Sequence, residues 1–457
     1  MIKTNLLFMI CIVSGFLLTL QLICLQILVR KGQIEVKSSW SLLDVVTFNA
    51  HHNSIPLFII DSEILKNISM KSHDLTRNTY CNILCSDRPI IHLATLSQFA
   101  TQLLVDRFIN AVKAKGYTVL QFKELDPIVN HLDIEVHILT HLIIIDESVN
   151  FEKTTHVIHI AVFYERLQST NWWHGLLNLN DDQKRLLHRQ GVKKSHFKVS
   201  LNNAIYDKVE IIRTTIDGLY LHLPNPMNNF MQKPEDVEFI ECNKSQANIF
   251  REKYGREDNE EANNFRIKAT LLLTKVKHIL DELSVPFWLS SGTALGYYRQ
   301  CDFITYSQDV DIGIWIYDYK PELIDAFSIN DLLLIHRFGE IGDSFELSFL
   351  DKDIKLDIFF FYKQEDHVWN GGTQAKTGNK YKYIFPDFQL CWTELINLKV
   401  RIPCQTLTYI EANYGRNWFE PIKEWDWKSS PPNVEPNGQW PPDKWKDVIQ
   451  LLPIPGF

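Results

Sequence analysis

Three aspartates on two predicted strands are the residues of this sequence best suited to chemistry. In Asp309-Val310-Asp311 the acids alternate with an apolar residue, so both carboxylates face the same side of a strand whose other side is buried. Asp357 is a single acid within the apolar strand 354–362. If the two strands lie close together, three carboxylates converge. Carboxylates that repel one another are stabilised by a hard cation, so the pattern predicts a Mg²⁺ or Mn²⁺ site made of these three residues.

A purely structural role for the same acids is the alternative. Asp357 could pair with a basic residue, while Asp309 and Asp311 could be solvated. A buried charge is unstable without a partner, so a cation or a basic side chain must compensate Asp357. Three acids in this order favour the metal site. Within it, Asp357 is either a third ligand or the general base for an attacking hydroxyl, and the sequence leaves both roles open.

A turn of small residues ahead of the acids is a candidate phosphate site. Ser291, Gly292 and Thr293 follow a short predicted strand and open a helix. Backbone N–H groups at such a turn, together with the helix dipole, attract anions. Arg299 in that helix and Lys376 beside a glycine-containing loop are candidate contacts to a diphosphate. These five residues form the predicted donor-binding set.

The predicted elements place all these residues in the second of two domains. Residues 55–250 alternate strand-like and helix-like runs, the order of an α/β domain with a mostly parallel sheet. Residues 251–457 begin with a helix and continue with strands, which predicts an α+β domain. Two of its strands, 345–350 and 355–362, are joined by a short turn of Asp and Lys and predict a hairpin.

The N-terminal segment predicts a membrane anchor. Residues 6–29 carry no charge, and a helix of that length spans about 36 Å, enough to cross a hydrocarbon core of about 30 Å. We expect residues 1–5 to be a cytoplasmic tail, 6–29 an uncleaved transmembrane signal anchor and 30–54 a stem. Glycosylation sequons at Asn67 and Asn243 agree with a lumenal body.

Composition excludes some functions without naming one. The 457 residues are 45% hydrophobic and 22% charged, as in a globular protein. The net charge of −8 and the absence of a long basic run disfavour a nucleic-acid partner. Two of the eight cysteines lie in the predicted anchor. The sequence leaves open how the others pair: Cys81, Cys85, Cys242, Cys301, Cys391 and Cys404.

The order of these motifs resembles that of the nucleotidyltransferase-fold superfamily, in which a small-residue turn precedes Asp-x-Asp on a strand and an acid on a later strand. Longer motifs narrow the resemblance to the LicD-like phosphotransferases, which move a phospho-alcohol from a CDP carrier. They lie at 287–293, 309–311, 369–378 and 425–433. The resemblance covers essentially the whole chain and implies a LicD-like catalytic domain at 251–457.

What the resemblance implies about activity is specific. It implies a metal-dependent transferase that moves ribitol 5-phosphate from CDP-ribitol to the GalNAc end of the phosphorylated O-mannosyl trisaccharide on α-dystroglycan. It also implies a single-pass type II protein of the Golgi membrane, with a lumenal catalytic part. Other Golgi transferases of the ribitol-phosphate and O-mannose pathway are the implied partners.

Two other functions share part of this pattern. A glycosyltransferase can use Asp-x-Asp to hold a UDP-sugar, but the third acid on a later strand favours the nucleotidyltransferase layout. A non-catalytic Golgi scaffold for other transferases would not need to bind a divalent ion. A comparison of CDP-ribitol binding with UDP-sugar binding distinguishes the glycosyltransferase from the predicted phosphotransferase. Titration with Mg²⁺ or Mn²⁺ distinguishes the scaffold from both enzymes.

Overall fold

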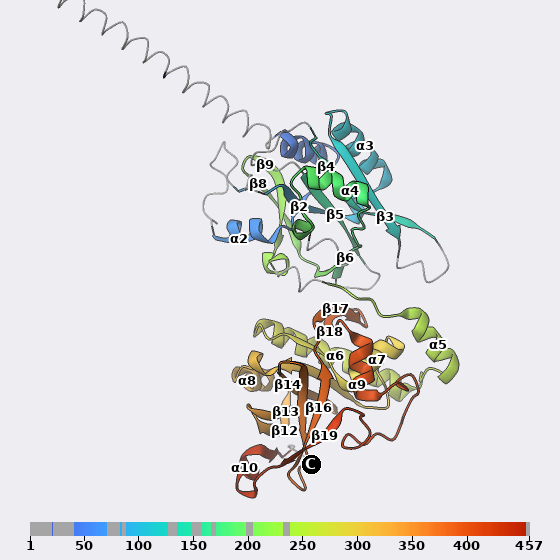
Figure 1. Ribbon diagram of the computed structural model, residues 1–457, viewed down its shortest axis with the longest axis vertical. Coiled ribbons are helices and arrows are strands. Elements are labelled where there is room, and N and C mark those ends of the chain that lie inside the picture. The colour runs from blue at the N-terminus through green and yellow to red at the C-terminus, as the bar shows by residue number, and fades with distance from the viewer. Residues whose placement is uncertain are drawn as a thin grey trace, which may run out of the picture.

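The chain folds around two nine-stranded sheets, one in each half of the sequence (Figure 1). The computed structural model describes residues 21, 41–70, 83–84, 88–126, 135–147, 157–165, 171–197, 204–231 and 238–453. The first body, after helical residues 41–52, contains β1 (Phe58–Ile59), α2 (Ser62–Met70), β2 (Ile90–Leu96), α3 (Gln102–Lys113), β3 (Thr118–Leu125), β4 (His137–Ile145), β5 (Val157–Glu165), β6 (Asn171–His174), α4 (Asp181–Arg189), β7 (Ala204–Asp207), β8 (Glu210–Ile216) and β9 (Leu219–Asn225).

The first sheet is mixed, and the prediction of a mostly parallel sheet is wrong. Its order is β3-β4-β5-β2-β1-β9-β8, with β6 and β7 continuing from β5. Only β2–β5 and β1–β9 are parallel among its described pairs. The cause is local: β3–β4 and β8–β9 are hairpins, and hairpins are antiparallel. Apolar side chains cover both faces, with α3 on one core and α4 on the other.

The second body carries the predicted site. Its elements are α5 (Lys244–Tyr254), α6 (Glu260–Glu282), β10 (Phe287–Leu289), α7 (Ser291–Gln300), β11 (Asp309–Trp315), α8 (Glu322–Ile329), β12 (Leu333–Glu340), β13 (Asp343–Asp351), β14 (Ile354–Lys363), β15 (His367–Thr373), β16 (Asn379–Pro386), β17 (Leu390–Leu395), β18 (Leu398–Pro403), α9 (Thr406–Tyr414), β19 (Val434–Gln439), α10 (Trp445–Val448) and β20 (Ile449–Leu451).

Strand β14 lies at the centre of the second sheet, whose order is β19-β16-β15-β14-β13-β12-β20. Its residues 355–361 pair in parallel with β11, and its residues 361–363 pair with β15. Alternate residues of β11 and β14 face the core beneath α6 and α8, among them Val310, Ile312, Leu356 and Ile358, all 0% exposed. The intervening residues, including the aspartates, therefore face the opposite side of the sheet.

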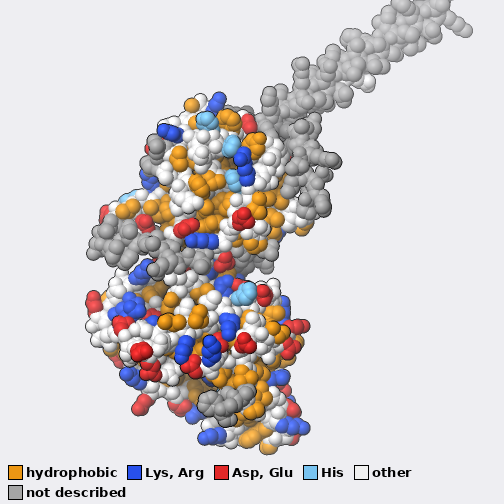
Figure 2. All heavy atoms as spheres, turned by 180° about the vertical axis from the view of Figure 1, so that it is seen from behind, with side chains coloured by type: hydrophobic (Ala, Val, Ile, Leu, Met, Phe, Trp, Pro, Cys, Tyr) orange, Lys and Arg blue, Asp and Glu red, His pale blue; other side chains and the backbone are white. Residues whose placement is uncertain are grey.

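The two bodies meet through the β17–β18 hairpin. Lys399, only 2% exposed, pairs with Asp207 of β7 at 3.1 Å. Trp392 packs with Phe239 and Ile205 in a small separate core. On the face shown in Figure 2, acidic and basic side chains are interspersed over the second body.

Two described disulfides lie in the second body. Cys391–Cys404 closes the β17–β18 hairpin, and Cys242–Cys301 joins the segment before α5 to the end of α7. The other two cysteines outside the N-terminal segment, Cys81 and Cys85, lie outside the described residues.

The predicted transmembrane helix, and with it the single-pass membrane location, needs correction. Among the described residues no helix has both the length and the apolar character needed to cross a membrane. The longest, α6, has 23 residues, but it is amphipathic and begins with Glu260 and Glu261. The segment 6–29 lies, except for Gln21, outside the described residues. Residues 41–52, within the predicted stem, pack Leu42 and Leu43 into the first core.

Four histidines are buried together in the first sheet: His92, His141, His159 and His174. The Nδ1 atoms of His92 and His159 lie 3.0 Å apart, and His159 Nε2 lies 3.1 Å from His141 Nδ1. Burial lowers the pKa of His141 to about 3 and that of His174 to about 4, and it also lowers the pKa of His92 and His159.

The first body should therefore lose stability as the pH falls below about 6.5. Above that pH both states hold neutral imidazoles; below it the unfolded chain binds protons that the folded state takes up only near pH 3 to 4. At pH 5, His141 and His174 should each lower the free energy of unfolding by about 2 kcal/mol. Between pH 7 and pH 5, the free energy of unfolding of His174→Gln should fall by less than that of the wild type, as measured by denaturant unfolding. The exposed His188→Gln is the matched control, and an equal reduction there would contradict the assignment.

Candidate active site

The register of β11 on β14 brings the three aspartates together. Asp311 lies opposite Asp357, and Asp309 lies opposite Lys355, on parallel strands. One carboxylate oxygen from each aspartate lies within 4.8 Å of one from each of the others. The convergence predicted from the sequence is therefore present, while the roles of these residues stay a prediction.

The electrostatics of this cluster favour a cation. Burial, and then the charge of Asp357, raise the pKa of Asp309 to about 6. Burial and the neighbouring carboxylates raise the pKa of Asp311 well above its usual range. A divalent ion placed among the oxygens would remove both the repulsion and the desolvation penalty. The donor set of hard carboxylate oxygens thus fits Mg²⁺ or Mn²⁺.

Lys355 compensates the negative charge of one of the three aspartates, Asp357. Its Nζ lies 2.7 Å from Asp357 Oδ2, while the Ser348 hydroxyl donates to Asp357 Oδ1 at 2.5 Å. Asp357 therefore has the basic partner that the sequence analysis considered as an alternative to a metal ion, and that partner is Lys355. Asp309 and Asp311 make no ion pair within 4.0 Å among the described residues. They are consequently the first two ligands that the site offers, with Asp357 held beside them.

The small-residue turn positions Asp311. The Gly292 N–H donates to Asp311 Oδ2 at 2.9 Å, and Thr293 Oγ1 accepts the backbone N–H of Asp311 at 2.8 Å. A Cβ at position 292 would lie 3.1 Å from the same carboxylate oxygen, which explains glycine there. Ser291 and Gly292 line the cavity described next, whereas Thr293 is buried below it. The Gly292 N–H thus contacts the carboxylate of Asp311 and Thr293 contacts its backbone, while the phosphate-binding role of this turn stays a prediction.

A cavity of about 480 Å³ lies above the aspartates. That volume is in the range of pockets for small molecules and nucleotides. Its floor is the polar face of β11, β13 and β14, and its walls come from α7, β15, β16 and the loop 415–431. Aromatic side chains from that loop, including Trp425 and Trp427, line one wall.

Arg299 is a buried cation without an acidic partner among the described residues. It is 1% exposed, lines the cavity, and lies 4.6 Å from the centre of the Phe250 ring. Its Nη2 donates to Gln300 Oε1 at 3.0 Å and to the Tyr306 hydroxyl at 3.4 Å. A buried charge needs compensation, so an anionic ligand fits here. Lys376, by contrast, is exposed in the β15–β16 turn and does not line the cavity.

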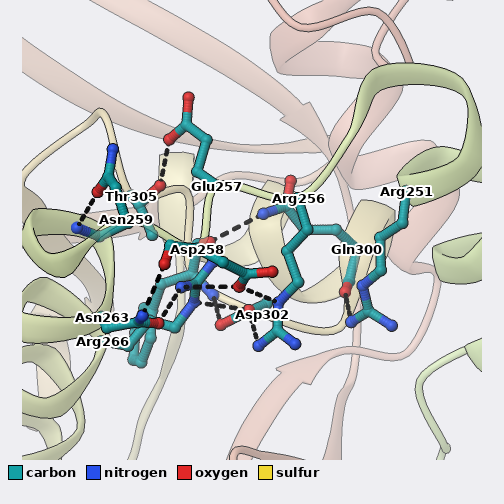
Figure 3. Close-up of polar contacts among 12 residues, drawn as sticks. Arg251, Arg256, Glu257, Asp258, Asn259, Asn263, Arg266, Gln300, Asp302 and Thr305 are labelled. Atoms are coloured by element: carbon teal, nitrogen blue, oxygen red, sulfur yellow. Dashed lines mark hydrogen bonds and ion pairs between the residues drawn. The ribbon is translucent and has the colours of Figure 1, made fainter.

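A buried polar network fixes the loop that leads from α7 to Asp309. Arg266 of α6 donates to Asp302 at 2.9 Å, and Arg251 of α5 donates to the backbone oxygen of Gln300 at 2.9 Å (Figure 3). Because these contacts join two helices to residues 300–302, the entry to β11 and the position of Arg299 are set together.

Sequence reasoning missed Glu346, Lys355, His336 and Asn370, which also line the cavity. Glu346 lies two residues from Ser348, which pairs with Asp357, so strand alternation puts it on the aspartate face. Burial, and then the charge of Asp357, raise the pKa of Glu346 to about 8. The predicted 345–362 hairpin contained the signal for Glu346, since its register fixes which residues face Asp357.

An Asp-x-Asp strand paired with a second acidic strand, beside a turn that opens a helix, defines the nucleotidyltransferase class. A family model described as LicD/FKTN/FKRP, nucleotidyltransferase domain, matches residues 284–405, and one described as Fukutin N-terminal matches residues 25–270. The chain belongs to the fukutin family.

Relatives agree with this membership along most of the chain. The mouse and human proteins named ribitol-5-phosphate transferase FKTN are each 41% identical over 428 residues, covering 91% of this chain and 88% of those proteins. An uncharacterized Caenorhabditis elegans protein is 28% identical over 251 residues, which is 50% of this chain and 62% of that protein.

Proposed function

We propose that this chain transfers ribitol 5-phosphate from CDP-ribitol to the GalNAc end of the phosphorylated O-mannosyl trisaccharide on α-dystroglycan. The observation that carries the proposal is the set of three carboxylates within 4.8 Å on the floor of a cavity that also holds Arg299, which has no acidic partner among the described residues. The names and 41% identity of the mouse and human relatives support the choice of ribitol phosphate as the transferred group.

Different residues of the cavity bind the metal ion and the donor phosphate in the proposed reaction. When bound by Asp309 and Asp311, Mg²⁺ or Mn²⁺ supplies neutralisation of charge on the diphosphate. Gly292 holds Asp311 in its ligating orientation through the 2.9 Å hydrogen bond. Arg299 binds a donor phosphate from the wall of the cavity, as a planar guanidinium does well.

The proton has a definite path in this scheme. The acceptor oxygen forms a bond to the phosphorus of ribitol phosphate, and the bond from that phosphorus to CMP breaks. The acceptor's proton passes to Asp357. Although Ser348 and Lys355 already contact Asp357, a carboxylate has about four lone-pair sites and keeps room for the proton. Lys355 stays beside the reacting groups as a fixed positive charge.

Mass measurement of the acceptor after reaction tests the proposal. The full chain, CDP-ribitol, Mg²⁺ and a phosphorylated O-mannosyl glycopeptide should yield product heavier by one ribitol phosphate. Chelating the metal should stop the reaction, and adding Mn²⁺ should restore it. Transfer from a UDP-sugar without transfer from CDP-ribitol would establish the glycosyltransferase alternative instead. If the protein bound neither a nucleotide donor nor a divalent metal ion, the scaffold role would remain.

A further inference from the structure

Two polar side chains in the cavity lack partners among the described residues. Asn370 of β15 is 6% exposed, and its Oδ1 accepts no hydrogen bond. Glu346 of β13 makes neither a hydrogen bond nor an ion pair within the part of the chain that the structure describes. A buried polar atom left unpaired, such as Asn370 Oδ1, costs about 1–3 kcal/mol. Such atoms in a cavity wall are therefore expected to bind a ligand group.

The two side chains lie at the same corner of the cavity. Asn370 is directly opposite Tyr383 on the paired strands β15 and β16, and both line the cavity. Glu346 and Tyr383 line the same cavity, and β13, which carries Glu346, comes close to β15 where Gly371 meets Ser344. The Tyr383 hydroxyl donates to the backbone oxygen of Trp427 at 2.8 Å, so an aromatic wall adjoins the two polar groups.

A glycine fixes this corner in place. Strand β15 leaves β14 after Asn370 and crosses close to β13, and a Cβ at position 371 would collide with Ser344. The close approach that Gly371 permits sets the backbone of Asn370 beside the strand that carries Glu346. Asn370 is thus held on a rigid element rather than on a loop.

The chemistry of the corner selects an uncharged, hydroxyl-rich group. A carboxyl and an amide accept and donate hydrogen bonds to neighbouring hydroxyls. The rings of Tyr383 and Trp427 offer a surface for the carbon-bound face of a sugar or polyol. A phosphate is better suited to the guanidinium of Arg299, a fixed cation in the wall of the same cavity.

We propose that Glu346 and Asn370 form a subsite for a neutral polyhydroxyl group of a substrate, separate from the phosphate contact at Arg299. This inference rests on the proposed function, whose substrates contain two such groups: the ribitol of the donor and the terminal sugar of the acceptor. Either source has the chemistry that the corner recognises.

Calorimetric binding of three ligands to the full chain with Mn²⁺ tests the subsite. The ligands are CDP, CDP-ribitol and the acceptor glycopeptide, and the variants are Glu346→Gln and Asn370→Ala. Both variants should bind CDP within about twofold of wild type. They should lose about tenfold in affinity for CDP-ribitol if the ribitol occupies the corner, or for the glycopeptide if the acceptor sugar does, the loss expected from one to two hydrogen bonds.

The matched control is Glu365→Gln, the same chemical change in the exposed turn between β14 and β15. Melting temperatures of all variants verify that each is folded. An equal loss of affinity for CDP itself, or no loss for any ligand, would overturn the polyol subsite while leaving the proposed function standing. Failure of the wild-type protein to bind CDP or CDP-ribitol would instead overturn the proposed function, and this inference with it.

Discussion

Replacing Asp311 by asparagine should abolish transfer while leaving the protein at least as stable as before. Asp311 is 6% exposed, and its amide replacement keeps the shape of the side chain but removes the negative charge of the proposed metal ligand. Loss of several kcal/mol of charge stabilisation at the reacting phosphate corresponds to a fall in rate of about a thousandfold or more. Steady-state kinetics with CDP-ribitol measure this change.

The Asp311→Asn replacement should not lower the thermal stability of the metal-free protein. Burial and two neighbouring carboxylates raise the pKa of Asp311, so its ionised form destabilises the metal-free fold at neutral pH. For such a group the stability falls as the pH rises from the unfolded value toward the folded one. Asp311→Asn should therefore melt at or above the wild-type temperature at pH 7 in chelator. Asp325→Asn, on the exposed side of α8, is the control. A clear drop in melting temperature for Asp311→Asn would show a structural role instead.

Replacing Arg299 by methionine should weaken donor binding more than it slows turnover. Methionine can keep an apolar contact with Phe250 while removing the buried charge that fits a phosphate. Loss of one charged hydrogen bond is worth about 1.5–3 kcal/mol, or about a ten- to hundredfold rise in KM for CDP-ribitol.

The lysine variant at the same position distinguishes charge from geometry. Arg299→Lys keeps the charge but not the planar fork of donors, so its KM should fall between those of wild type and Arg299→Met. Arg401→Met, on the β17–β18 hairpin and outside the cavity lining, is the comparison. Unchanged KM in both Arg299 variants would mean that the guanidinium serves the fold alone.

The aspartate cluster was predictable because strand alternation is a local property. Alternation in β11 fixes the shared face of Asp309 and Asp311, and the apolar neighbours of Asp357 fix its face. The predicted hairpin between β13 and β14 is likewise present. What a local pattern cannot contain is which strand pairs with which. The β11–β14 pairing joins residues about 45 positions apart and decides whether the acids meet at all.

Long-range contacts also determine features of the site that a local sequence pattern cannot contain. The turn at Gly292 has the sequence of a phosphate site, but the packing of α7 against β11 directs its N–H to Asp311. Lys376 lies next to glycines in sequence, yet the β15–β16 hairpin carries it away from the cavity. Asn370 has no distinguishing pattern, since its burial depends on where β15 crosses β13. The mixed first sheet differs from expectation because hairpins and crossovers give similar strand patterns.

Diffraction from crystals grown with Mn²⁺ and CDP tests whether Asp309 and Asp311 hold the metal ion on which the proposed transfer depends. We expect an anomalous peak at bonding distance from oxygens of both Asp309 and Asp311, with the CDP phosphates on the same ion. If CDP were bound but no ion lay between these carboxylates, with Lys355 Nζ filling the space instead, the metal-dependent transfer proposed for this chain would be contradicted.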